Sequence, residues 1–188
     1  MTPIRAAMLT PRPWPNGLGI TRDVAGSEGE ELGWLISIAD LTEEAAFSHF
    51  PGVDRTFTLI EGAGATLTVD GTVLPCRPFV PVLFPGDRPT HYLPQGGAAR
   101  AFNVFAARNA FEARVSVQAV AASHRVAAGE AVLAVHCAEG ALAVGDARLE
   151  AGDTLLHPGS APIEAVGAAA TAIIVALRPT NPRPSVMR

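Results

Sequence analysis

Large apolar residues and small or polar residues alternate along most of the chain with a period of two. In the segment Trp34–Leu41 the apolar side chains of Trp34, Ile36 and Ile38 share one parity, and Ser37 and Ala39 share the other. The segment Arg55–Ile60 alternates in the same way. Because successive side chains of a strand point to opposite faces, this period predicts β-strands.

The same pattern predicts strands along the rest of the chain. They are expected at Thr2–Leu9, Ile20–Val24, Val80–Phe84, His91–Leu93, Ala99–Ala106, Val115–Val120, Val132–Val135 and Thr171–Leu177. Helical periodicity is scarce, and short strands at regular turn spacing are typical of sandwiches and barrels. The predicted fold class is therefore all-β.

Glycine and proline mark the turns between these strands. Phe50-Pro51-Gly52-Val53 fits a type II turn, in which proline presets the second position and glycine accepts a positive φ at the third. Asp70-Gly71 is a strong hairpin signal, and Asn16-Gly17-Leu18-Gly19 predicts a tight turn.

The order of strands and turns repeats within the chain. Leu142 and Val144 match Leu67 and Val69 with an offset of 75 residues. The Gly-Asp pair at 152–153 matches that at 86–87 with an offset of 66. This order is typical of cupin halves, so we expect a bicupin of two double-stranded β-helix, jelly-roll-like half-barrels. The expected parts are residues 1–122 with the ligand pocket, residues 123–178, and a loose tail at 179–188.

Composition narrows the classes of partner. The chain has 188 residues, a formal net charge of −4 and no basic block, so nucleic acid and anionic membrane surfaces are not expected partners. No apolar run approaches the roughly 20 residues of a membrane span. Cys76 and Cys137 stand outside any metal-binding spacing and are expected to be reduced thiols. With no signal-peptide pattern, the expected location is cytoplasmic.

No motif indicates a metal, a cofactor or a catalytic residue. The five histidines, at positions 49, 91, 124, 136 and 157, lack the His-x-His spacing of metal-binding cupins. A degenerate site of His136 and His157 near Glu139 is an alternative. There is no G-x-S-x-G, and His136 and Cys137 point to opposite faces of a strand.

Polar residues on otherwise apolar strands are the better candidates for chemistry. Arg55 and Asn103 both lie within strand patterns, and an arginine fork with a carboxamide can hold a small carboxylate or amide. Trp14 or Phe50 would wall such a pocket. The full set of candidate ligand-binding residues is Arg55, Asn103, Trp14, Asn16, Arg22, Ser37, Asp40, Phe50 and Asp54. The alternative is that Arg55 pairs with Asp40 or Asp54 and only ties two strands together.

Four segments also resemble a known family. WLISIAD, FSHFPGVDRTFTLIEGAG, PWPNGLGITRDVA and AFNVFAAR, between about Trp14 and Arg108, are similar to the HutD/Ves family of bacterial bicupin proteins. The family usually has Lys, Gly, Arg and Asp where this chain has Pro15, Leu18, Leu35 and Ala101. The resemblance implies a role around histidine utilisation, with a small acid such as urocanate or formylglutamate as ligand.

Three functions remain open from the sequence. The first is a non-enzymatic, regulatory protein that binds a small molecule. The second is a cupin-type enzyme, an isomerase, lyase or hydrolase of a small polar metabolite. The third is a scaffold that forms a homodimer through an apolar strand edge of its second half.

Overall fold

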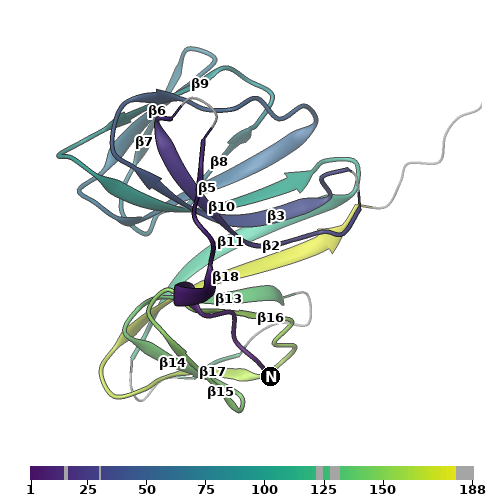
Figure 1. Ribbon diagram of the computed structural model, residues 1–188. Helices are drawn as coiled ribbons and strands as arrows, with labels where there is room; N and C mark the ends of the chain where they lie inside the picture. The colour runs from purple at the N-terminus through teal and green to yellow at the C-terminus, as the bar shows by residue number, and fades with distance from the viewer. Residues whose placement is uncertain (15–16, 30, 122–124, 128–131, 181–188) are drawn as a thin grey trace, which may run out of the picture. The chain divides into compact units, whose positions relative to one another are not determined.

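The computed structural model describes residues 1–14, 17–29, 31–121, 125–127 and 132–180, and almost all of its regular structure is β (Figure 1). The one helix in this part of the chain is the 3₁₀ turn η1 (Ala6–Met8). Among these residues no helix is long and apolar enough to cross a membrane.

Eighteen strands are labelled in chain order. They are β1 (Arg12–Pro13), β2 (Gly19–Gly26), β3 (Trp34–Leu41), β4 (Ala45–Ala46), β5 (Val53–Glu61), β6 (Ala65–Val69), β7 (Thr72–Cys76), β8 (Val82–Pro85), β9 (Thr90–Pro94), β10 (Ala99–Ala107), β11 (Phe111–Val120), β12 (Arg125–Ala127), β13 (Val132–Glu139), β14 (Ala141–Val144), β15 (Ala147–Glu150), β16 (Thr154–Leu156), β17 (Pro162–Ala165) and β18 (Ala170–Pro179).

The chain separates into two compact units. Among the described residues, the first barrel comprises those of Pro11–Ala113 and of positions 178–180, and the second barrel comprises those of Met1–Thr10 and Arg114–Leu177. The division therefore differs from the expected boundary at residue 122 in two ways. Strand β11 belongs to a sheet with β18, β13 and β16, and the N-terminal residues pack with the second barrel.

The first barrel has two sheets with a shared core. One sheet has the order β1-β2-β3-β10-β5-β8, and the other has the order β4-β9-β6-β7. Side chains of alternating parity from both sheets meet between them, as the period of two predicts. The core includes Leu41, Phe57, Leu59, Leu67 and Tyr92, each at most 1% exposed.

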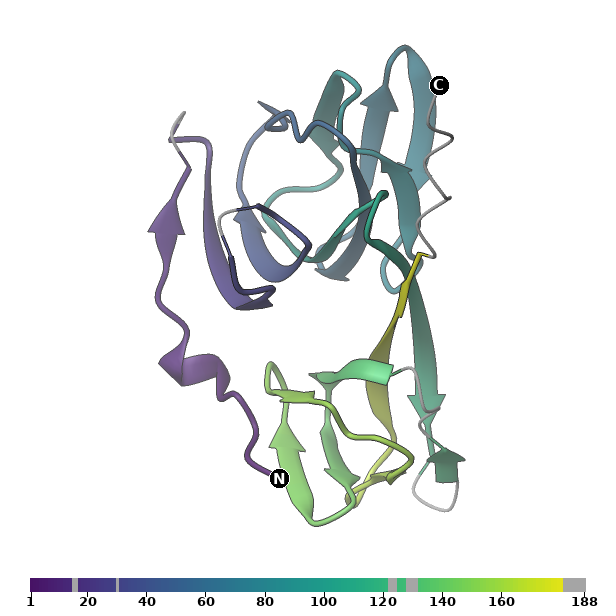
Figure 2. The same cartoon turned by 90° about the vertical axis from the view of Figure 1, so that its right-hand side faces the viewer.

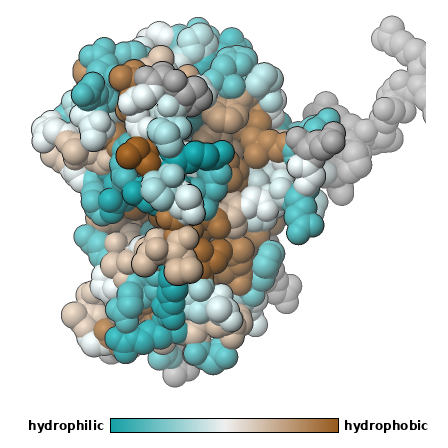
Figure 3. Space-filling view, in the orientation of Figure 1, coloured by the Kyte–Doolittle hydropathy of each residue, from teal (hydrophilic) through white to brown (hydrophobic). Residues whose placement is uncertain are grey.

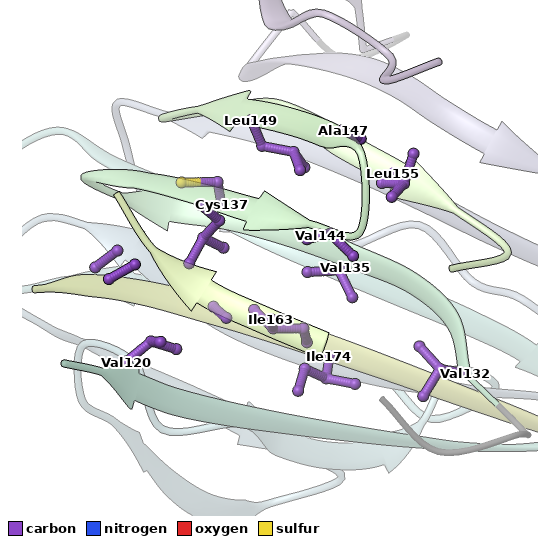
Figure 4. Close-up of a cluster of buried hydrophobic side chains, with 14 residues drawn as sticks. Val120, Val132, Val135, Cys137, Val144, Ala147, Leu149, Leu155, Ile163 and Ile174 are labelled. Atoms are coloured by element: carbon purple, nitrogen blue, oxygen red, sulfur yellow. The ribbon is translucent and has the colours of Figure 1, made fainter. Parts of the chain in front are cut away.

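The second barrel repeats this arrangement with an aliphatic interior. Its sheets have the orders β11-β18-β13-β16 and β12-β17-β14-β15. Figure 4 shows Val135, Cys137, Val144, Leu149 and Ile163 pointing into the space between its strands. All of these side chains are fully buried.

The strand orders establish the internal duplication. Each strand from β3 to β10 has its counterpart eight strands later, from β11 to β18, at the same place in its sheet. The match of Leu67 and Val69 to Leu142 and Val144 is confirmed, because both pairs precede two-residue hairpin loops in equivalent strands. The match of the two Gly-Asp pairs is wrong. One pair lies between β8 and β9 and the other between β15 and β16, so they are not equivalent corners.

The expected strand at Thr2–Leu9 is also wrong. Only Ile4 makes a β-bridge, to Thr154, before the chain enters η1. The carboxylate of Asp153 fixes this turn, since its Oδ1 accepts the backbone N–H of Ala6 at 3.0 Å and its Oδ2 accepts Arg5 at 2.6 Å. Figure 2 shows the N terminus beside the green part of the chain, where the terminal ammonium pairs with Asp146 at 3.1 Å.

The predicted turn at residues 50–53 and the predicted C-terminal tail have different outcomes. The type II turn is confirmed, with Gly52 at φ 70° and the N–H of Val53 donating to the carbonyl of Phe50 at 3.3 Å. Pro179 and Thr180 do not belong to a loose tail, because β18 continues to Pro179 and the N–H of Thr180 donates to the carbonyl of Ala110. Positions 181–188 lie outside the described residues.

Charged residues on the surface are mixed with apolar ones. On the face shown in Figure 3, hydrophilic and hydrophobic residues are interspersed. Among the described residues, the large apolar side chains most exposed to solvent are Met8, Val73 and Leu83, which lie on different elements.

Candidate functional site

The inner face of the six-stranded sheet carries a row of polar side chains. Asp23 of β2 pairs in register with Ser37 of β3, and Ser37 pairs with Asn103 of β10. Arg55 of β5 lies in the neighbouring row, opposite Phe105 of β10. Because directly paired residues of adjacent strands project to the same face, the register brings these side chains together.

These residues line a cavity of about 370 Å³ in the first barrel. Its wall is formed by residues of β1, β2, β3, β5 and β10, by Trp14 just after β1, and by the segment between β4 and β5. They are Arg12, Pro13, Trp14, Thr21, Asp23, Leu35, Ser37, Ala39, Phe47, Ser48, Phe50, Arg55, Asn103 and Phe105. The volume is at the lower end of the range of small-molecule pockets.

Arg55 is the buried cation of this cavity. Its side chain is only 5% exposed, and no ion pair joins it to any carboxylate of the described residues. Nη2 donates to Oδ1 of Asn103 at 3.5 Å, the outer limit of a hydrogen bond, and Nε has no partner in the described chain. Burial lowers the pKa of Arg55 to about 9, which leaves the guanidinium protonated at neutral pH.

Aromatic rings surround the guanidinium in place of a counter-ion. Its central carbon lies 4.5 Å from the ring centre of Phe47 and 4.7 Å from that of Phe105. The rings of Phe84 and Phe50 lie 5.4 and 5.7 Å away. Cation–π contacts of this kind stabilise a desolvated cation by about 2 kcal/mol, which does not replace the hydrogen bonds lost from water.

Asn103 and Ser37 give the buried end of the cavity its other polar atoms. Asn103 is 3% exposed, and its Nδ2 donates only a long bond of 3.4 Å to the carbonyl of Ala101. Ser37 is 4% exposed. An oxygen ligand placed here could accept from Arg55 and Asn103 together, which is how carboxylates are usually held.

The outer end of the cavity carries an ion pair. Arg12 of β1 binds Oδ2 of Asp23 through Nη2, and their side chains are 65% and 41% exposed. Trp14 lies close by, edge-on to Phe47 with ring centres 6.0 Å apart. The cavity therefore runs from a solvent-exposed ion pair to a buried, unpaired cation.

The structure brings together five of the nine candidate residues. Arg55, Asn103, Trp14, Ser37 and Phe50 all line the cavity. Asn16 lies outside the described residues.

Arg22, Asp40 and Asp54 lie on the other parity of their strands and bind other charges. Asp40 accepts Arg22 at 2.5 Å and Arg100 at 2.7 Å. Partial burial raises the pKa of Asp40, but these hydrogen bonds outweigh it and lower the pKa. Asp54 binds Arg108 at 2.6 Å, so neither acid pairs with Arg55 and the strand-tying alternative does not hold.

Sequence reasoning missed several residues of the site. Phe105 shares its parity with Asn103 on β10, and Asp23 pairs in register with Ser37, so strand pairing would have pointed to both. Phe47, Ser48 and Arg12 lie in irregular segments or a two-residue strand, where no alternation indicates which way a side chain points.

The second barrel does not repeat the polar row. Arg55 stands six positions before the glutamate of the Glu-Gly turn at residues 61–62. Leu133 stands six positions before the glutamate of the Glu-Gly turn at residues 139–140, so it corresponds to Arg55. Asn103 pairs with Phe57, and the corresponding pair is Ile174 with Val135. Both polar positions are thus apolar in the second barrel, and its core is aliphatic at these places.

Among the residues that the structure describes, no three His, Cys, Asp or Glu side chains form a group that could hold a metal ion. His136 is fully buried, with Nδ1 2.9 Å from Oγ1 of Thr154. His157 is exposed. Both cysteines are free and buried.

Solved structures share this architecture. A conserved protein of unknown function from Pseudomonas aeruginosa PAO1 superimposes with a TM-score of 0.86 at 29% identity, covering 94% of this chain and 97% of that one. HutD from Pseudomonas fluorescens SBW25 gives 0.81 at 27% identity, covering 96% and 99%. A cupin 2 conserved barrel domain protein from Leptotrichia buccalis gives 0.61 at 9% identity over 94% and 96% of the chains, which supports the cupin fold alone.

Curated relatives match over part of their sequences. An uncharacterized 21.2 kDa protein in the hutC 3′ region of Pseudomonas putida is 38% identical over 60% of this chain and 61% of its own. Protein Ves of Cronobacter sakazakii is 33% identical over 55% and 59%. The matched stretch thus spans about three-fifths of these relatives. Because the HutD family model matches from residue 6 to residue 175, the chain belongs to the HutD family.

Proposed function

We propose that this protein binds a small carboxylate in the cavity of its first barrel and acts as a regulatory, non-catalytic protein of histidine utilisation. The observation that carries the proposal is Arg55, a buried guanidinium with an unpartnered Nε and no carboxylate of the described residues beside it. Perturbed, desolvated charges of this kind are concentrated at functional sites.

The energetics favour an anionic ligand. A buried charge without a hydrogen-bonded counter-ion costs several kcal/mol. A bound carboxylate would replace the missing partner with charge-assisted hydrogen bonds to Arg55 and Asn103. The free protein would then hold an unfavourable charge whose cost the ligand removes.

The relatives support the choice of acid. A homologue lies in the hutC 3′ region of Pseudomonas putida, and the solved HutD of Pseudomonas fluorescens is described in a formate condition. Formate is the smallest carboxylate. Urocanate and formylglutamate are acids of histidine breakdown, and both end in a carboxylate that Arg55 could hold.

The lining of the cavity favours binding over turnover. Its only carboxylate is Asp23, which is already in an ion pair, and its described lining includes no histidine or cysteine. General acid–base catalysis needs a titratable group within hydrogen-bond reach of the reacting atoms. The groups around Arg55 are rings and amide atoms instead.

Calorimetric titration and thermal unfolding test the proposal. Urocanate or formylglutamate should bind the native protein and raise its melting temperature. Arg55→Met, which keeps an unbranched apolar stem, should abolish both effects and leave the free protein at least as stable as the wild type, because the uncompensated charge is gone. Arg88→Met, at an exposed arginine paired with Asp70, is the matched control and should keep the response. Binding that survives Arg55→Met, or no binding of either acid at millimolar concentration, would contradict the proposal.

A further inference from the structure

The cavity contains one uncompensated charge, although two arginines line it. Arg55 has no acidic partner in the described chain, whereas Arg12 is neutralised by Asp23. A ligand with a single negative charge therefore balances the cavity. A ligand with two would leave its second charge opposed by Asp23 unless that ion pair broke.

The outer end also offers an acceptor. Arg12 binds Oδ2 of Asp23, and Oδ1 accepts no hydrogen bond from any described residue. Asp23 and Asn103 flank Ser37 in direct register, on strands two spacings apart. Two strand spacings are about 10 Å, which sets the distance between the acceptor and the anion-binding end.

The walls between the two ends are flat. The ring of Phe47 lies over the Arg55 guanidinium, and the ring of Trp14 stands edge-on to the ring of Phe47. Aromatic walls favour a planar, unsaturated body, since ring faces stack on planar groups.

Building on the carboxylate-binding function proposed above, we propose that Asp23 is a specificity residue that selects a planar monocarboxylate with an N–H donor at its far end. The carboxylate lies on Arg55 and Asn103, and the N–H donates to Oδ1 of Asp23. Dicarboxylates are disfavoured, because Asp23 repels the second carboxylate and occupies the arginine that would bind it. Of the two acids considered above, urocanate fits this description and formylglutamate, with two carboxylates, does not.

Three probes separate the contributions in calorimetric titrations. trans-Urocanate has a carboxylate and a ring N–H. trans-3-(2-Furyl)acrylate has a similar planar body without the N–H, and trans,trans-muconate is a planar dianion. The wild-type protein should bind urocanate about tenfold more tightly than the other two, as expected for one hydrogen bond to a charged acceptor.

Asp23→Asn should exchange these preferences. Urocanate should lose most of its advantage over furylacrylate, and muconate should bind about tenfold more tightly than to the wild type, since Arg12 is released. Asp70→Asn, which breaks the exposed Arg88–Asp70 pair away from the cavity, should change none of the three affinities.

The outcomes distinguish this inference from the proposed function. Equal affinity for urocanate and furylacrylate, or tightest binding of muconate by the wild type, would overturn the role of Asp23. If Arg55→Met abolished the binding of these carboxylates in either case, the proposed carboxylate-binding function would stand. Failure of all three probes to bind, with formylglutamate still bound, would overturn this inference alone, and failure of formylglutamate as well would overturn both.

Discussion

Nη2 of Arg55 lies 3.5 Å from Oδ1 of Asn103, and Nε of the same guanidinium touches no acceptor in the described chain. A carboxamide is a neutral partner, so the most buried cation of the first barrel is left without a counter-charge. The ring centres of Phe47 and Phe105 lie 4.5 and 4.7 Å from its central carbon. This relationship is the reason to expect a negatively charged ligand.

Replacing Asn103 by aspartate should supply the missing counter-charge from within the protein. The new carboxylate would face Arg55 and form the ion pair that the wild type lacks. We expect Asn103→Asp to be at least as stable as the wild type in thermal unfolding and to lose carboxylate binding by about 100-fold in calorimetry, because the site is already filled.

Asn103→Leu is the comparison variant for this prediction. It has nearly the same volume but supplies no charge, so Arg55 should remain available and binding should fall by about tenfold, through the lost amide. Equal affinities for the two variants would mean that Arg55 does not hold the anion.

Trp14 should report on occupation of the cavity. Its ring lines the cavity beside Phe47, and the chain has only one other tryptophan, Trp34. In the variant Trp34→Phe, titration with a carboxylate should change the emission of Trp14 in a saturable way. The same titration of Trp14→Phe should leave the emission of Trp34 unchanged. A response from Trp34 alone would place binding elsewhere.

His136 should make the second barrel sensitive to acid. Burial lowers its pKa to about 4 from the usual 6.5, although the nearby Asp153 raises it slightly. Between these two pH values the unfolded chain binds a proton that the native protein does not, so the free energy of unfolding falls as the pH is lowered from 6.5 to about 4. Denaturant unfolding at pH 7.5 and pH 4.5 should show a loss of roughly 2 kcal/mol from this group.

His136→Asn removes the titrating ring and should reduce that difference. His157→Asn is the control in the same barrel, since His157 is exposed and its positive φ of 50° suits asparagine. An unchanged pH dependence in His136→Asn would show that another group is responsible.

Alternation and turn chemistry were enough to predict the fold. The strands at Trp34–Leu41 and Ala99–Ala106, the Pro51-Gly52 turn and the duplication follow from local patterns, because side-chain period and positive φ are encoded within a few residues. The strand expected at Thr2–Leu9 failed because a contact about 150 residues away, from Asp153, decides its conformation.

The candidate site was harder to predict. Arg55 and Asn103 were identifiable as polar residues on apolar strands. For the β3 candidates Ser37 and Asp40, both faces of the strand are buried, so alternation could not tell which of the two faces the cavity. Asp40 shares its parity with Ile36 and Ile38, on the opposite face from Ser37. Only the register of β3 with β2 and β10 separates the two sets.

A crystal structure of the protein soaked with trans-urocanate tests the central claim most directly. The account predicts the carboxylate within about 3 Å of the Arg55 guanidinium and the Asn103 amide, with the planar body beside Phe47 and Trp14. Density for the acid at another place, with Arg55 still unpaired in an empty cavity, would contradict it.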